Sequence, residues 1–415
     1  MSKKRTVCMV TDWYPTKENP YVGSFFKEQA LALREHFDFL VVHYKEKGTV
    51  PDPLYWLHCC RNTQIRVDKV SQERNLTEYT ITAEKPLSIG ILCKLCKLIA
   101  KLRRKPYTVP AVYRKHRKKQ LHNGFVKALG ASFDLLYCVS AQAESGLLQE
   151  IAGVANKPYV VAEHAPFPWP GTTLKQESRD AIAQADAFLA ISWDKVRQVM
   201  MQDVHPRKIC YVGNLVNEKQ FALGSGSGGA KTFVMVAAHS FYKNYPLFIE
   251  IFNRLTQITD EPFKVMVVGY NANKGYSKDA DVLEQKLKSS AFASSIELIP
   301  AISRDQIQTV YGRADAFVMT SVQEGMPVSA LEAGCCGLPI FSTMCGGVED
   351  YVDDSIGRIF KIVDSEAFAQ TLKDYLEGKL KFDSQHIRQH IVSKFGHKAF
   401  TENIAAIFNN VIDQF

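Results

Sequence analysis

The sequence lacks features that several classes of protein need. No run of 18 apolar residues occurs, so no segment is long enough to cross a bilayer as a helix. The ten cysteines are too sparse among 415 residues for a disulfide framework, and we expect reduced thiols. The apolar stretch at residues 7–10 is too short for a signal-peptide core. We therefore expect a cytoplasmic protein, either free or held on the cytoplasmic face of a membrane.

Signs of a metal site or a nucleic-acid module are also scarce. Cys93 and Cys96 form one CxxC without a second pair at zinc spacing, which favours two thiols on a helix over a metal site. No finger or helix-turn-helix pattern accompanies the basic residues, and no aromatic residues are interleaved with them. We expect no nucleic-acid partner and assign no metal ligand.

Acidic residues are missing from one long segment, residues 85–133. It holds 13 Lys and Arg and no Asp or Glu, so the remainder has a net charge of −5 although the whole chain has +8. Two sets of residues recur within it at helical spacing: Leu92, Leu95, Ile99 and Leu102, and, two residues later, Lys94, Lys97, Lys101 and Arg104. Two residues turn a helix by about 200°, which places the sets on opposite faces. The pattern fits a helix on an anionic membrane surface, or an apolar face packed on the protein's own sheet with solvated lysines.

Short apolar strands alternating with amphipathic helices are abundant. In the first half, strand patterns occur at 6–10, 37–44, 135–140, 159–164 and 187–192, with helical patterns between most of them. Such alternation is typical of a parallel α/β sheet. The glycines of GSGSGGAK follow, and Gly224, Gly226 and Gly229 fit GxGxxG. That motif needs a strand before it and a helix after it, whereas here a strand follows, so we interpret the segment as a linker.

The alternation then restarts, which predicts a second domain of the same class. The expected fold class is α/β, with two Rossmann-like domains facing each other across a cleft that is the default ligand site. The expected units are domain 1–213, linker 214–231, domain 232–395 and a terminal helix at 396–415. One face of that helix carries Phe400, Ile404, Ile407, Phe408, Val411, Ile412 and Phe415. We expect it to pack back on the first domain.

Residues 314–350 are the most informative segment. A buried strand is predicted to end at Thr320, and Pro327 stands where a helix begins, a position that needs no N–H. The backbone N–H groups of Gly325 and Val328 are then expected at a positive helix end, which suits an anion such as a diphosphate.

Two carboxylates accompany this predicted helix. Glu324 precedes it, and Glu332 lies roughly 8 Å further along its axis, too far for the two to share one proton. They are more suited to holding two parts of one ligand, a sugar at Glu324 and a ribose at Glu332, because carboxylates accept strong bonds from sugar hydroxyls. The alternative is a loop Glu and a helix Glu without a ligand.

The segment EGMPVSALEA, followed by GLPIFST and GGVE, resembles the E-x7-E donor site of retaining glycosyltransferases of family 4, which have a GT-B fold. Further similarities follow in the family's order: PYVGSFFKEQALAL, VVAEH, ADAFLAISWDKV, KICYVGNLVNEKQF and VAAHSFYKN. Together they extend over nearly the whole chain. The resemblance implies transfer of a sugar, with retention, from a nucleoside-diphosphate sugar to a glycan or lipid-linked acceptor. It implies no cofactor and no metal.

The resemblance also assigns roles to residues. Glu324 would contact the donor sugar, Glu332 the ribose, and Lys243 the leaving diphosphate. Gly23 would let the backbone approach the phosphates, and His164 would lie near the reacting carbon. The donor-binding set is completed by Gly325, Met326 and Val328.

Two departures from the family pattern leave alternatives open. Ala238 stands where the family usually has an Arg, so His239 or another basic residue would have to supply that charge. The loop after Val268 is longer than usual and has fewer glycines. Ala238 makes a catalytically silent member, which binds a donor or a membrane, one alternative function. A nucleotide-sugar epimerase of the same fold is the other.

Overall fold

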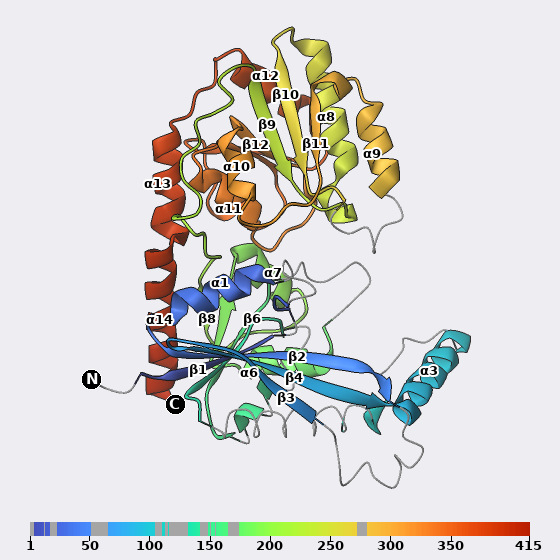
Figure 1. The fold of residues 1–415 in the computed structure, drawn as a ribbon, viewed down its shortest axis with the longest axis vertical. Helices are drawn as coiled ribbons and strands as arrows, with labels where there is room; N and C mark the ends of the chain where they lie inside the picture. The colour runs from blue at the N-terminus through green and yellow to red at the C-terminus, as the bar shows by residue number, and fades with distance from the viewer. Residues whose placement is uncertain are drawn as a thin grey trace.

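A computed structural model gives the fold. It describes residues 4–11, 13–16, 23–50, 65–103, 110–112, 115, 132–141, 148–149, 151–153, 155–164, 174–271 and 280–415. Two sheets, each with helices beside it, lie one above the other and are joined along one side by the last two helices (Figure 1). The two Rossmann-like domains expected from the sequence are present, one built around each sheet.

The first sheet has eight strands in the order β3-β4-β2-β1-β5-β6-β7-β8. Their bounds are β1 Thr6–Thr11, β2 Asp38–Val50, β3 Ile65–Glu73, β4 Leu76–Pro86, β5 Leu135–Cys138, β6 Tyr159–Ala162, β7 Ala187–Ala190 and β8 Ile209–Tyr211. Its central strands are buried on both faces, which explains their continuous apolar sequence. The helices of this half include α1 (Ser24–Leu33), α6 (Gln176–Gln184) and α7 (Trp193–Met200).

The hairpin of β3 and β4 departs from the wholly parallel sheet that the sequence predicts. β3 runs antiparallel to β4, which pairs in parallel with β2. With β2 these strands form an arm that reaches α3 (Leu87–Leu102) at its far end (Figure 1). α3 is the predicted amphipathic helix. The rest of the basic segment at 104–109, 113–114 and 116–131 lies outside the described residues.

The second sheet has six parallel strands in the order β11-β10-β9-β12-β13-β14. They are β9 Lys231–Val236, β10 Phe263–Val268, β11 Ile296–Ile299, β12 Ala316–Met319, β13 Ile340–Thr343 and β14 Gly357–Phe360. Successive strands are added in one direction from β9 and then in the other from β12. Ligands bind at such a reversal in open α/β sheets.

The helices of the second half connect its strands or follow the last of them. They are α8 Tyr245–Ile258, α9 Ala280–Lys288, α10 Ile307–Gly312, α11 Val328–Cys335, α12 Ser365–Leu376, α13 Ser384–Phe395 and α14 His397–Gln414, with short 3-10 helices η1 Phe241–Lys243, η2 Ala293–Ser295 and η3 Val348–Asp350. None of the helices in the described ranges combines the length and apolar character needed to cross a bilayer.

The last helix, α14, lies against the first sheet although α13 belongs to the second domain (Figure 1). The ring of Phe408 packs against Phe37 and Tyr137, and Arg5 donates to the Asn409 side chain at 2.9 Å. Phe415, predicted on the same apolar face, is instead 60% exposed because it follows the last helical turn.

Replacing Phe408 should therefore destabilise the first domain. Phe408→Ala removes a fully buried ring from a packed interface, and we expect a loss of about 3–5 kcal/mol in the free energy of unfolding. Phe415→Ala is the matched control and should change it by less than about 0.5 kcal/mol. Urea unfolding followed by circular dichroism measures both. Equal effects would show that α14 does not stabilise the first domain.

Candidate functional site

The predicted site residues all follow the carboxyl ends of parallel strands. Lys243 follows β9 and Glu324 follows β12, and these two strands are neighbours at the reversal of the second sheet. Gly23 follows β1 and His164 follows β6 in the first sheet. Strands that end at one edge bring residues distant in sequence together.

Lys243 and Glu324 form an ion pair. The Lys243 Nζ lies 2.6 Å from the Glu324 Oε1, and both side chains are largely buried. The Glu324 N–H donates to the Cys345 carbonyl at 2.6 Å, and the Thr320 hydroxyl donates to the Lys243 carbonyl at 2.9 Å. The structure thus joins the residue proposed to meet the sugar with the residue proposed to meet the diphosphate.

Gly23 begins α1 with a left-handed backbone, φ 66°. A Cβ at this position would lie 2.4 Å from the Trp13 carbonyl oxygen, so the loop after β1 requires glycine here. This contact is a packing reason for the glycine that is independent of any phosphate.

Gly325 brings the second domain against the first. A Cβ on Gly325 would lie 2.6 Å from the His164 carbonyl oxygen and 3.0 Å from the Ile191 side chain. The His164 ring packs on Phe25 and Phe26 of α1, the helix that Gly23 begins. His164, α1 and Gly325 therefore lie close together at the domain interface.

The His164 imidazole is neutral at physiological pH. Burial and the nearby Lys195 ammonium lower the pKa of His164 to about 3, against a smaller opposing effect from Asn214. Burial also lowers the pKa of Lys195, to about 8. At this position His164 can offer hydrogen bonds, but it adds no positive charge for a diphosphate.

Glu332 is held by two residues that the sequence analysis did not single out. Its Oε1 lies 2.6 Å from Arg304 Nη1, and the Tyr311 hydroxyl donates to its Oε2 at 3.1 Å. Arg304 also reaches across to Glu28 of α1, with Nη2 2.8 Å from Oε2. In the sequence, only the position of Arg304 after the carboxyl end of β11 could have indicated a role for it. Its partners are too distant in the sequence to form a recognisable motif with it.

Met326, predicted as a donor-binding residue, has a buried side chain, and its carbonyl accepts from the Asn214 amide at 2.9 Å. This hydrogen bond connects the loop before α11 to the segment after β8. Val328, predicted to offer its N–H, is the first residue of α11.

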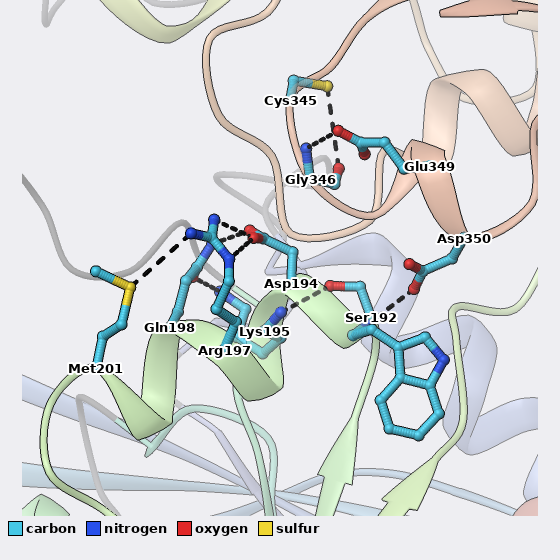
Figure 2. Close-up of polar contacts among 11 residues, drawn as sticks. Ser192, Asp194, Lys195, Arg197, Gln198, Met201, Cys345, Gly346, Glu349 and Asp350 are labelled. Carbon is cyan, nitrogen blue, oxygen red and sulfur yellow. Dashed lines mark hydrogen bonds and ion pairs between the residues drawn. The ribbon is translucent and has the colours of Figure 1, made fainter.

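A second contact between the domains joins α7 to the loop after β13 (Figure 2). The Trp193 N–H donates to Asp350 Oδ2 at 2.9 Å. The Asp194 carboxylate lies under Gly346, where a Cβ would be 2.7 Å from Oδ2. Burial raises the pKa of Asp350, and the Trp193 N–H and Tyr211 hydroxyl partly offset that rise.

Three helices that follow strands of the two sheets begin without a side-chain cap. α1, α8 and α11 follow β1, β9 and β12, and none has a side-chain cap on its first N–H groups. By contrast, the side chains of Asp364 and Asp383 cap α12 and α13. An uncapped N-terminus carries partial positive charge and donors suited to an anion.

His239 was predicted as one possible source of the positive charge that Ala238 does not supply. The His239 ring packs edge-on against Tyr245 and lines a cavity of about 620 Å³ between α8 and α9. The longer loop after Val268 has residues 272–279 outside the described part. Among the described residues, no cluster of three or more His, Cys, Asp or Glu is arranged to hold a metal.

The known proteins that this chain resembles include several glycosyltransferases. Residues 217–391 match the family model "Glycosyl transferases group 1". The phosphatidylinositol N-acetylglucosaminyltransferase gpi3 subunit of Schizosaccharomyces pombe is 23% identical over 45% of this chain and 41% of its own length. The lipopolysaccharide 1,6-galactosyltransferase of Salmonella typhimurium is 23% identical over 59% of this chain and 67% of its own. The chain spans about two fifths of the length of the first curated relatives it matches.

Solved structures match the whole chain. The apo lipopolysaccharide outer core galactosyltransferase WaaB has a TM-score of 0.65 at 16% identity, covering 99% of both chains. The α,α-trehalose 6-phosphate synthase of Burkholderia multivorans has a TM-score of 0.69 at 12% identity, covering 100% of both. Anabaena HepE in complex with UDP has a TM-score of 0.66 at 12% identity, covering 98% of this chain and all of its own. The chain has the GT-B fold.

The contact at Gly325 predicts that a single methyl group disturbs the interface. Gly325→Ala places a Cβ against the His164 carbonyl, and we expect a loss of about 1–3 kcal/mol in the free energy of unfolding. Gly229→Ala adds the same methyl where no atom lies within 4 Å and should have little effect. Guanidinium unfolding measures both variants. An unchanged Gly325→Ala protein would contradict the close approach of the domains.

Proposed function

We propose that this protein is a retaining, metal-independent glycosyltransferase. It moves a sugar from a nucleoside-diphosphate sugar to an acceptor hydroxyl in glycolipid or polysaccharide assembly. The group 1 family match over 217–391 and the GT-B fold support the reaction class. The observation that carries the proposal is the Lys243–Glu324 pair at the reversal of the second sheet, facing the first domain.

The residues divide the work along the donor. Glu332 takes the ribose hydroxyls, Lys243 the diphosphate, and Glu324 the sugar, with the N–H groups of Gly325, Met326 and Val328 at the phosphates. The bond from the anomeric carbon to the diphosphate oxygen breaks, and a bond to the acceptor oxygen forms on the same face. The acceptor proton passes to the leaving phosphate oxygen. Negative charge grows on the diphosphate, so Lys243 and nearby helix N-termini lower the barrier.

Removing the charge of Glu324 tests this assignment. Glu324→Gln keeps the shape but loses a charge-assisted hydrogen bond of about 1.5–3 kcal/mol, so we expect kcat to fall about 10- to 150-fold. The assay measures release of nucleoside diphosphate from a panel of nucleotide sugars, with and without acceptor and with EDTA throughout. Release should require the acceptor and should resist EDTA.

A matched control uses an ion pair away from the cleft. Glu297 pairs with Arg313 at 2.6 Å on the exposed side of the second domain, and Glu297→Gln should keep wild-type turnover. Near-normal turnover in Glu324→Gln would overturn the donor-site assignment. Acceptor-independent release would instead favour the epimerase, and absence of turnover in the wild type would favour a silent member.

The acceptor class is proposed from α3. Its larger apolar side chains point to solvent: Ile91, Leu95, Leu98, Ile99 and Leu102 are 46–75% exposed. The small residues Gly90 and Cys93 are buried and Leu92 is half-buried, which supports a mostly solvent-facing apolar stripe. The exposed lysines Lys94, Lys97 and Lys101 run beside it. An apolar face with adjacent lysines suits a bilayer with anionic headgroups, where a lipid-linked acceptor resides.

We therefore expect the protein to bind vesicles containing phosphatidylglycerol at low salt, to be released as salt rises, and to ignore phosphatidylcholine vesicles. Changing Lys94, Lys97 and Lys101 to Gln should weaken cosedimentation at least tenfold. The control changes three exposed lysines of the second domain, Lys264, Lys361 and Lys381, to Gln. Equal loss in both triple variants, or no binding by the wild type, would refute a membrane site on α3.

A further inference from the structure

We propose that Arg304 is a positioning residue that ties the ribose-binding carboxylate Glu332 to α1 through Glu28. Ribose binding and one of the contacts between the domains then depend on the same side chain. The inference rests on the proposed function, because it takes Glu332 as the ribose ligand. It adds a residue that connects α11 of the second domain to α1 of the first domain.

The geometry is that of one guanidinium between two carboxylates. Arg304 Nη1 lies 2.6 Å from Glu332 Oε1, while Nη2 lies 2.8 Å from Glu28 Oε2 and Nε pairs with Glu28 Oε1. The guanidinium therefore donates two hydrogen bonds to Glu28 and forms an ion pair with Glu332. A planar fork with five donors can make this arrangement, whereas an ammonium group cannot.

The three charges are shielded from water, so their pairing matters. The exposed fractions of the side chains are 24% for Arg304, 19% for Glu28 and 5% for Glu332. Without Arg304, two carboxylates from different domains would face each other unpaired. Removing one partner from a buried charge cluster is more disruptive than losing a surface ion pair.

Arg304 is itself held in place by the segment that joins the domains. Its carbonyl accepts from the Gln220 amide at 2.6 Å, and its guanidinium lies over the Phe221 ring, 5.9 Å from the centroid. The side chain is therefore oriented before a donor arrives, as a positioning role requires.

The ionisation of Glu332 also depends on Arg304. Burial raises the pKa of Glu332, and Glu28 adds to that rise, whereas the Arg304 cation and the Tyr311 hydroxyl lower it. The buried thiol of Cys336 follows Glu332 by four residues. Loss of Arg304 would favour the protonated acid, which is a poorer acceptor for ribose hydroxyls.

The link reaches the part of the first domain that is proposed to meet the phosphates. Glu28 lies on α1, five residues after Gly23, and Phe25 and Phe26 of the same helix pack on His164. A carboxylate on α1 can thus influence ribose binding without touching the nucleotide.

The test compares a ribonucleotide with its 2′-deoxy counterpart. The probe is whichever of UDP, GDP and ADP raises the melting temperature of the wild type, together with its 2′-deoxy form, and calorimetry gives both affinities. We expect the wild type to prefer the ribonucleotide about tenfold or more. Arg304→Met should lose that preference by weakening the ribonucleotide about tenfold while leaving the deoxynucleotide within about twofold. A residue with only a structural role would weaken both alike.

Further variants separate positioning from folding. Arg304→Lys keeps a charge but cannot hold both carboxylates, so its preference should be intermediate. Glu28→Gln should weaken the ribonucleotide several-fold in the wild type and not in the Arg304→Met background, because the two act through one contact. Asp350→Ala is the control: it removes another hydrogen bond between the domains, away from Glu332, and should keep the preference.

The possible failures can be told apart. If no nucleoside diphosphate binds the wild type, or if Glu332→Ala keeps the ribose preference, the proposed function is wrong and the inference falls with it. If Glu332→Ala loses the preference while a folded Arg304→Met protein keeps it, the inference alone is overturned. Additive effects of Glu28→Gln and Arg304→Met would also overturn the link to α1.

Discussion

The site depends on how the chain passes between its two sheets. It crosses once after β8 and returns between α13 and α14, and the two crossings touch at Phe395. The Val216 N–H donates to the Phe395 carbonyl at 2.9 Å, and Gly213, with φ 67°, leaves room for the Phe395 ring. The Glu218 carboxylate accepts from the His397 N–H at 2.8 Å, where α14 begins. These contacts fix the sheets so that residues following the strands of one meet those following the strands of the other.

The charged side chains of the candidate site pair with one another within the protein. Lys243 neutralises Glu324, and Arg304 serves Glu28 and Glu332 together, which leaves one excess negative charge among the five groups. Under the proposed function, a nucleoside-diphosphate sugar would add further negative charge at the same place. Its binding would then require an exchange of partners, in which the diphosphate pairs with the Lys243 cation and Glu324 becomes available for sugar hydroxyls. Paired carboxylates keep the cations oriented until that exchange.

The sequence predicted what depends on local patterns and missed what depends on distant partners. The buried strands and their following helices were predictable because continuous apolar runs alternate with amphipathic ones. The β3–β4 hairpin was not, because Ile65–Glu73 is mostly polar and lies at the sheet edge. Glu324, Glu332 and Lys243 stood out through a known motif. Arg304 did not, since its contact to Glu28 joins residues 276 apart.

Because position 238 holds Ala and not Arg, positive charge for a diphosphate has to come from other groups. Lys243 is a single cation, and His164 stays neutral because burial lowers its pKa to about 3. The uncapped N-termini of α1, α8 and α11 add partial positive charge near these side chains. Each such end is equivalent to roughly half a positive charge, so three of them exceed one guanidinium. Their dipoles are fixed by the fold and need no reorganisation as charge develops, which is the property that lowers a barrier.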